Sequence, residues 1–196
     1  MRPSTAQTEG TRILNKADKI LKEIKNMTNR KFLPIVGPDK GRVLARVIHE
    51  VKPKRVLEVG TLIGYSAIMM AKELESDAHL ITIEIHANEA EMARANIKRA
   101  EVSPSIDVIV GDAIEVIPKL AGKFDMVFID ADKTEYLDYL RLVERKLHRG
   151  SVVVADNAGI FADQMKDYLD YVRSSGRYRS EYVSFDEDGV EVSVKL

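Results

Sequence analysis

The sequence contains no cysteine and no tryptophan among its 196 residues. Without cysteine, the protein has no disulfides, no thiolate nucleophile and no cysteine-ligated zinc site. Its formal net charge of −1 gives no overall basicity that would favour binding to nucleic acid or to an anionic membrane. No apolar run has the length of a membrane-spanning helix, and the N-terminal residues lack the apolar region of a signal peptide. We therefore expect a cytoplasmic protein without a membrane partner.

The composition is that of a globular chain, with 45% hydrophobic and 31% charged residues. At this length we expect one domain over residues 1–196. Apolar residues at helical spacing predict an amphipathic helix with a basic outer face at 12–27. A segment with two prolines and two glycines follows, and a second helix is predicted at 40–51, before Pro53. Residues 1–52 would then be a helical extension to a core at 53–196.

From residue 55 onward, short runs rich in Val and Ile alternate with helical patterns. The predicted strands are 55–60, 79–85, 106–112, 124–130, 151–156, 178–185 and 190–196, and the helices are 65–74, 88–100, 113–120, 134–147 and 163–175. Near-continuous apolar strands between helices indicate a parallel sheet buried on both faces. The segment Asp-Glu-Asp-Gly at 186–189 is a hairpin signal. We predict a doubly wound, Rossmann-like α/β fold with seven strands, mostly parallel, closed by an antiparallel C-terminal hairpin.

Ligands of such sheets bind at the carboxyl ends of the strands, where the strand order reverses. The predicted strands deliver a set of acidic, glycine and amide residues to that edge, namely Glu58, Gly60, Glu84, Gly111, Asp112, Asp130, Asp132, Asp156 and Asn157, with Lys133 beside them. This is more charge than folding requires.

The first strand leads into a glycine turn at Gly60 and Gly64, followed by Ser66. Such a turn lets the backbone approach a ligand near the start of a helix, although it also occurs as an ordinary strand–helix connection. The spacing is not the G-x-G-x-x-G of dinucleotide-binding proteins. Glu58 would repel a pyrophosphate and suits a ligand with an ammonium or sulfonium group.

Two later acids are consistent with a nucleoside ligand. Glu84 stands where nucleotide-binding sheets place the carboxylate that accepts both ribose hydroxyls. Asp112 could accept from an exocyclic amine such as that of adenine, or it could cap the helix that follows. Glu84 could equally be a solvated acid at a strand end. Together with the glycine turn, these residues predict an adenosine-containing ligand.

Asp130, Asp156 and Asn157 form a second group. All three offer oxygen ligands from strands expected to be neighbours, and hard cations such as Mg²⁺ or Ca²⁺ prefer oxygen. Each could instead be a turn or capping residue, and Asp130 could pair with Lys133. A divalent cation nearby would disfavour the ammonium form of Lys133, which suits a general base, whereas the alternative is a surface lysine. The four histidines show no metal-ligand spacing and are interpreted as non-catalytic.

Five segments together resemble the catechol O-methyltransferase-like family of S-adenosylmethionine-dependent O-methyltransferases, which are class I methyltransferases. They are VGPDKGRVLARVI, VLEVGTLIGYSAI, LITIEI, FDMVFIDADK and LHRGSVVVADN, between residues 36 and 157. The resemblance implies that Mg²⁺, or Ca²⁺ or Mn²⁺ at the same site, binds Asp130, Asp156 and Asn157, and that Lys133 is the catalytic base beside Asp130. It also implies a homodimer.

The resemblance further assigns S-adenosylmethionine contacts by motif position. Glu58 and Gly60 would border the methionine part, and Ser66 would meet its carboxylate. Glu84 would take the ribose hydroxyls, Ile85 would pack on the adenine, and Asp112 and Ala113 would border the adenine edge. The remaining donor contacts are Val36, through its backbone, and Asp130.

The sequence departs from the mammalian catechol enzymes at three positions. Ala131 and Asp132 replace a His-Trp pair, and Tyr182, next to Glu181, stands near the glutamate that contacts the second catechol hydroxyl. The resemblance implies a phenolic or catechol-like small molecule as the acceptor. It also leaves tRNA hydroxyuridine, which some bacterial members of the family methylate, as an alternative with which the basic first helix is compatible. Two other classes stay open, a nicotinamide-dependent oxidoreductase and a non-catalytic module that binds an adenosine ligand.

Overall fold

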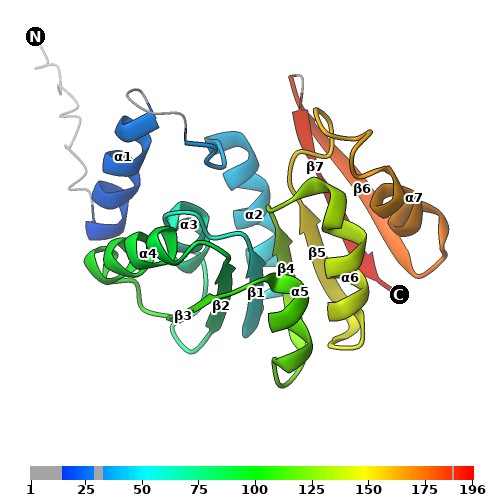
Figure 1. The fold of residues 1–196 in the computed structure, drawn as a ribbon, viewed down its shortest axis with the longest axis horizontal. Coiled ribbons are helices and arrows are strands. Elements are labelled where there is room, and N and C mark those ends of the chain that lie inside the picture. Colours follow the sequence, from blue (N-terminus) through cyan, green and yellow to red (C-terminus); the bar gives the residue numbers. More distant parts are fainter. Residues whose placement is uncertain (1–14, 29–32, 187) are drawn as a thin grey trace, which may run out of the picture.

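A seven-stranded mixed sheet runs through the centre of the structure in the order β3-β2-β1-β4-β5-β7-β6 (Figure 1). The computed structural model describes residues 15–28, 33–186 and 188–196. The strands are β1 (Arg55–Val59), β2 (His79–Glu84), β3 (Ser105–Val110), β4 (Phe124–Ile129), β5 (Leu147–Ala155), β6 (Tyr178–Phe185) and β7 (Asp188–Lys195). The first five pair in parallel, and β7 pairs antiparallel with both β5 and β6. The predicted fold is confirmed.

Helices cover both faces of this sheet. They are α1 (Lys16–Thr28), α2 (Pro38–Val51), α3 (Tyr65–Ala71), α4 (Ala87–Ala100), α5 (Ala113–Val116), α6 (Tyr136–Glu144) and α7 (Lys166–Ser174), with 3₁₀ turns η1 (Ile117–Lys119) and η2 (Lys133–Glu135). In the described part of the chain, no helix combines the length and apolar character needed to span a membrane.

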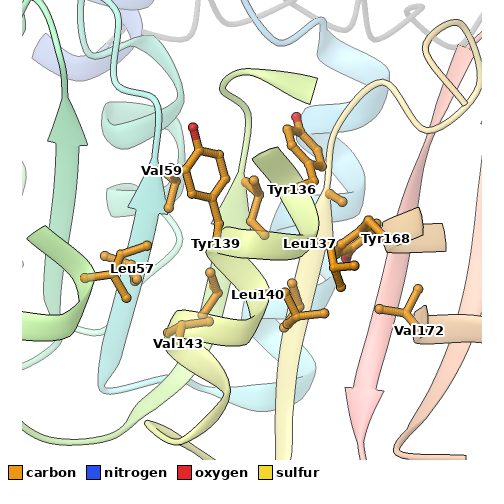
Figure 2. Close-up of a cluster of buried hydrophobic side chains, with 14 of the residues drawn as sticks. Leu57, Val59, Tyr136, Leu137, Tyr139, Leu140, Val143, Tyr168 and Val172 are labelled. Atoms are coloured by element: carbon orange, nitrogen blue, oxygen red, sulfur yellow. The ribbon is translucent and has the colours of Figure 1, made fainter. Parts of the chain in front are cut away.

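The apolar strands explain the two helix layers. Leu57 of β1 is level with Val127 of β4, and both are buried in the cluster that contains α6 and α7. Val56 and Met126, one residue earlier, face the opposite cluster with α2. Because successive strand residues point to opposite faces, a continuous apolar run supplies both layers of the core. Figure 2 shows the first of these clusters, in which side chains of α6 gather with side chains of β1 and α7.

The N-terminal helices differ in their relation to the core. α2 packs directly on the sheet through an apolar stripe that includes Val43, Leu44 and Val47. α1 lies further out, where Ile20 and Ile24 pack with Ile68 of α3. The boundary predicted between an N-terminal extension and the core, after residue 52, therefore lies just after α2, a helix that itself packs on the sheet. The first residues of the helix predicted at 12–27 lie outside the described residues.

Several predicted element boundaries differ from the structure, among them the three that follow. The helix predicted at 113–120 is α-helical only to Val116, and a 3₁₀ turn that contains Pro118 follows, because proline has no N–H for a continuing helix. Leu147, predicted as the end of a helix, instead begins β5 and pairs with Phe124. In the final hairpin, Asp188 is already a strand residue opposite Phe185. The hairpin turn is therefore shorter than predicted.

The strand order reverses between β1 and β4. The chain steps outward from β1 through β2 to β3, and then returns to place β4 on the other side of β1. The carboxyl ends of β1, β2, β4 and β5 consequently meet at one edge, where this class of sheet binds its ligands.

Candidate active site

A cavity of about 710 Å³ opens at the carboxyl edge of the sheet. Most of the predicted site residues line it, namely Val36, Gly60, Ser66, Glu84, Ile85, Asp112, Ala113, Asp130, Lys133, Asp156 and Asn157. Its size is within the range of small-molecule and cofactor sites. Glu58 is the exception, because its side chain is fully buried and does not line the cavity wall.

The turn after β1 forms one wall of the cavity. Gly60 has a φ of +94° and Gly64 a φ of +86°, a conformation that side chains with a Cβ adopt rarely. The amide of Gly60 donates to the Ile83 carbonyl at 3.0 Å, and the amide of Asp130 donates to the Val59 carbonyl at 2.8 Å. These bonds continue the ladder past the last residue of β1 and hold its turn against the ends of β2 and β4.

Glu58 lies beneath this turn with no hydrogen-bond partner for either carboxyl oxygen among the described residues. Burial, together with the nearby charges of Asp130 and Glu84, raises the pKa of Glu58 to about 7. A buried carboxylate without a partner carries a desolvation penalty. A cationic group bound above the turn would reduce this penalty through its charge, because the Glu58 side chain does not reach the cavity wall.

Glu84 and Asp112 each have a structural role as well as a place at the cavity. Oε2 of Glu84 accepts from the amide of Leu62 at 2.8 Å, and Oε1 accepts from the amide of His86 at 3.0 Å. Oδ1 of Asp112 accepts from the amide of Ile114 at 2.8 Å, which makes it the N-cap of α5. Asp112 can therefore cap α5 and also accept from an adenine amine, because the capping hydrogen bond uses only Oδ1 and leaves Oδ2 for that amine. Ile85 beside them is 60% exposed at the cavity.

Asp130 and Asp156 converge at the ends of β4 and β5. Burial and the nearby charge of Asp130 raise the pKa of Asp156 to about 6, and Lys40 opposes this rise. The Lys40 ammonium lies 2.6 Å from Oδ1 of Asp156 and 2.6 Å from Oδ2 of Asp188. Lys40 is thus the shared counter-ion of two closely spaced carboxylates, those of Asp156 and Asp188.

The donor set of Asp130, Asp156 and Asn157 fits a hard divalent cation. All three residues offer oxygen, and all line the same cavity. Burial first, and then the charge of Asp130, raise the pKa of Asp156, and a bound cation would offset both effects. Mg²⁺, Ca²⁺ and Mn²⁺ are the metals that such oxygen donors suit.

Lys133 is held inside the site and is not a free surface lysine. Its side chain is 13% exposed, and its Nζ donates to Oδ1 of Asp130 at 2.9 Å and to the hydroxyl of Tyr136 at 2.8 Å. The buried Tyr136 hydroxyl in turn donates to the backbone carbonyl of Asp156 at 3.4 Å. Burial, together with Asp130 and Asp156, raises the pKa of Tyr136 well above its usual value, so this hydroxyl stays protonated.

The residues where the sequence departs from the mammalian catechol enzymes occupy different places. Ala131 and Asp132 line the cavity, and Asp132 accepts from the amide and the hydroxyl of Thr134. Tyr182 is 40% exposed and is not among the residues that line the cavity, because its ring packs over Gly189. The structure thus places Asp132, but not Tyr182, at the site.

Of the four histidines, only His86 lines the cavity, with Nδ1 at 3.2 Å from Oε1 of Glu84. Glu84, His86 and Glu89 together offer ligand atoms within 4.8 Å of one another, a grouping that the sequence spacing did not indicate.

Three residues at the site are not predicted from the sequence, namely Lys40, Tyr136 and Asp188. Lys40 belongs to a segment that stood out for its prolines and glycines, and Asp188 to a hairpin signal. Tyr136 follows Lys133 by three residues, the spacing at which side chains on a helical turn meet. That spacing is the only local signal among the three, because Lys40 and Asp188 reach the site from distant parts of the chain.

Comparison with known proteins gives a consistent assignment. A family profile described as O-methyltransferase matches residues 12–173. Catechol O-methyltransferase B of Danio rerio is 36% identical over 181 residues, which is 86% of this chain and 68% of that protein. Catechol O-methyltransferase of Niastella koreensis is 40% identical over 126 residues, which is 62% of this chain and 57% of that protein.

A solved structure agrees with these sequence matches. The O-methyltransferase TomG of Streptomyces achromogenes, in complex with S-adenosylmethionine, superposes with a TM-score of 0.80 and 26% identity, covering 94% of this chain and 92% of that one. The chain therefore belongs to the catechol O-methyltransferase-like family of S-adenosylmethionine-dependent O-methyltransferases, enzymes that methylate hydroxyl groups.

Proposed function

We propose that this protein transfers a methyl group from S-adenosylmethionine to one hydroxyl of an aromatic acceptor that carries two adjacent oxygens, with Mg²⁺ bound and Lys133 as the general base. The observation that carries the proposal is the position of Lys133 Nζ, which lies 2.9 Å from Oδ1 of Asp130 in the cavity that Asp156 and Asn157 also line. The relatives named catechol O-methyltransferase support the acceptor class.

The donor would occupy the part of the cavity between the β1 turn and Ile85. The buried carboxylate of Glu58 lies under the turn and would favour the cationic methionine portion. Glu84 would accept from the ribose hydroxyls with acceptor capacity left after its bonds to the turn amides. Ile85 offers an exposed apolar surface for the adenine ring.

Mg²⁺, when bound by Asp130, Asp156 and Asn157, would act as a Lewis acid that lowers the pKa of an acceptor hydroxyl. Lys133 would remove the proton of that hydroxyl at Nζ, held in place by Asp130 and Tyr136. The acceptor oxygen would then form a bond to the methyl carbon as the carbon–sulfur bond breaks, which leaves S-adenosylhomocysteine. The protein contributes mainly by holding the two reactants in line.

A tRNA hydroxyuridine is the second candidate acceptor. Lys19, Lys22 and Lys25 are exposed on α1, which offers positive charge to a phosphate backbone. Three other charged residues of this helix are neutralised by ion pairs, since Lys16 pairs with Glu101, Asp18 with Lys72 and Glu23 with Arg99. The small-molecule acceptor is favoured because the cavity itself carries the acidic and metal-ligand chemistry.

The test is a transfer assay with donor labelled on its methyl group, screened over catechols, hydroxycinnamoyl phenols and undermodified tRNA, with Mg²⁺ or with EDTA. Lys133→Met should reduce turnover by about 10²-fold or more while S-adenosylhomocysteine still binds. Lys166→Met, which removes an exposed lysine of α7, is the matched control.

Three results would contradict the proposal. One is a rate that EDTA does not change, which removes the metal role. Another is full turnover by Lys133→Met, which removes the base. The third is tight binding of NAD with no response to S-adenosylhomocysteine, which would favour an oxidoreductase.

We also propose that the protein is cytoplasmic, as its sequence predicts, and that it acts as a homodimer, which rests on the family resemblance alone. Sedimentation equilibrium of the full chain measures the assembly directly, and a single monomeric species would contradict it.

A further inference from the structure

The side chain of Asn157 is hydrogen-bonded to the C-terminal hairpin formed by β6 and β7. Its side-chain nitrogen Nδ2 donates to Oδ2 of Asp188 at 2.8 Å, across 31 residues of sequence. Asn157 itself has a φ of +60°, and its neighbour Ala158 donates from its amide to the Gly189 carbonyl at 2.9 Å. The turn after β5 is therefore attached to the first residues of β7.

Asp188 is well placed to hold this amide in one orientation. Its Oδ1 accepts from the amides of Ile160 at 3.1 Å and Gly159 at 3.3 Å. Its Oδ2 accepts from Lys40 Nζ at 2.6 Å as well as from Asn157. A carboxylate surrounded by donors on both oxygens acts only as an acceptor, so the amide of Asn157 must face it with its NH₂ group.

We infer that Asp188 is a positioning residue for the metal site, which fixes the side-chain amide of Asn157 so that its carbonyl oxygen, and not its nitrogen, is the end available to a divalent cation. The inference rests on the proposed metal-dependent function. Only the oxygen of an amide binds Mg²⁺ or Mn²⁺, so a rotation of half a turn about the last side-chain bond would replace a ligand with an N–H donor. Partners that orient metal ligands in this way commonly affect affinity strongly.

A simple charge effect is the competing explanation, since Asp188 brings one more negative charge to the site. The two explanations differ in their dependence on Asn157. A charge acts through space and continues to attract the cation when Asn157 is replaced. If Asp188 instead acts by positioning the amide of Asn157, its effect on cation binding disappears when Asn157 is replaced.

The experiment is a double-mutant cycle on the full chain, with Mn²⁺ binding measured by electron paramagnetic resonance of the free ion, without donor or acceptor. Asp188→Ala should weaken Mn²⁺ binding by about tenfold to 100-fold. In an Asn157→Ala background, the same substitution should change binding by less than about twofold. Asp186→Ala, which removes a carboxylate from the same hairpin, is the matched control and should bind like the unaltered protein.

Two outcomes would overturn the inference. The first is an Asp188→Ala protein that binds Mn²⁺ as tightly as the unaltered chain. The second is an equal loss with and without Asn157, which would assign the effect to charge. If the unaltered protein binds no Mn²⁺ that depends on Asp130, the proposed metal-dependent function fails together with the inference.

Should Asp188→Ala not fold, Asp188→Asn replaces it in the same cycle, with Asn157→Asp as the background. Both ends of a carboxylate are oxygen, so an aspartate at position 157 needs no orientation. Positioning therefore predicts that Asp188→Asn weakens Mn²⁺ binding only when residue 157 is asparagine. Equal losses in the two backgrounds would overturn the inference.

Discussion

A Cβ atom on Gly60 would overlap the backbone carbonyl oxygen of Asp130. The glycine turn after β1 and the proposed metal ligand after β4 are thus in direct backbone contact. This contact joins the half of the cavity proposed for the methyl donor to the half proposed for the metal, so the geometry of one depends on the other.

Gly60→Ala should therefore disturb both halves at once. The new methyl group meets rigid backbone, and the φ of +94° adds conformational strain. We expect a loss of about 2 kcal/mol or more in the free energy of unfolding, with weaker binding of S-adenosylhomocysteine by calorimetry. Gly150→Ala is the control, because its φ is +89° but a Cβ there meets nothing within 4 Å. Equal losses in the two variants would show that the contact with Asp130 does not matter.

Glu58→Gln should change how stability depends on pH. The pKa of Glu58 is raised from 4.5 to about 7, so the folded state holds this proton more tightly than the unfolded chain. The stability linked to this proton is full below pH 4.5 and is lost as the pH rises toward 7, by about 3 kcal/mol. The variant should lose less stability over this range, as followed by urea unfolding between pH 5 and 8. Parallel profiles for both proteins would contradict the assigned titration.

Tyr136→Phe should lower kcat without releasing the donor. The hydroxyl that it removes accepts from Lys133 at 2.8 Å and donates to the Asp156 carbonyl at 3.4 Å. With Lys133 less well placed, we expect kcat to fall by about tenfold to 100-fold with little change in S-adenosylhomocysteine affinity. Tyr168→Phe is the control, because this equally buried hydroxyl has no hydrogen-bond partner among the described residues. A kcat for Tyr136→Phe equal to that of Tyr168→Phe would contradict the role.

The predicted part of the site follows from local sequence and a general property of the fold. Four runs rich in Val and Ile mark four strands, and an acidic residue stands at or next to the carboxyl end of each, namely Glu58, Glu84, Asp130 and Asp156. In a doubly wound sheet those ends meet at one edge, so the residues could be grouped without knowing any distance. The clustering of most of these residues around one cavity reflects this rule.

Asp188 and Lys40 could not be predicted in the same way. The hairpin signal at 186–189 indicates a turn, but not that β7 inserts between β5 and β6. Only this strand order brings Asp188 beside Asn157, and only the packing of α2 brings Lys40 to both acids. Local patterns carry no information on such pairings, because the partners are 148 residues apart in the case of Lys40 and Asp188.

The final prediction concerns the balance of charge around Lys40. Its side chain is 14% exposed and forms ion pairs with Asp156 and Asp188, whose side chains are 4% and 20% exposed. Lys40→Met leaves these carboxylates without their counter-ion, and we expect the metal-free protein to lose about 3 kcal/mol in its free energy of unfolding. Lys54→Met is the control, because Lys54 pairs with Glu75 and Asp77 at the surface, where ion pairs contribute little.

Added Mg²⁺ should then stabilise the Lys40→Met protein more than the unaltered chain. A cation bound by Asp130 and Asp156 takes over part of the charge that Lys40 compensated, and binding to the folded state alone raises stability by mass action. Thermal unfolding in EDTA and in Mg²⁺ measures both proteins under the same conditions. If Lys40 and the cation share one group of carboxylates, Mg²⁺ should raise the melting temperature of Lys40→Met by more than it raises that of the unaltered protein. Equal rises would show that the ion pairs of Lys40 are independent of the metal site.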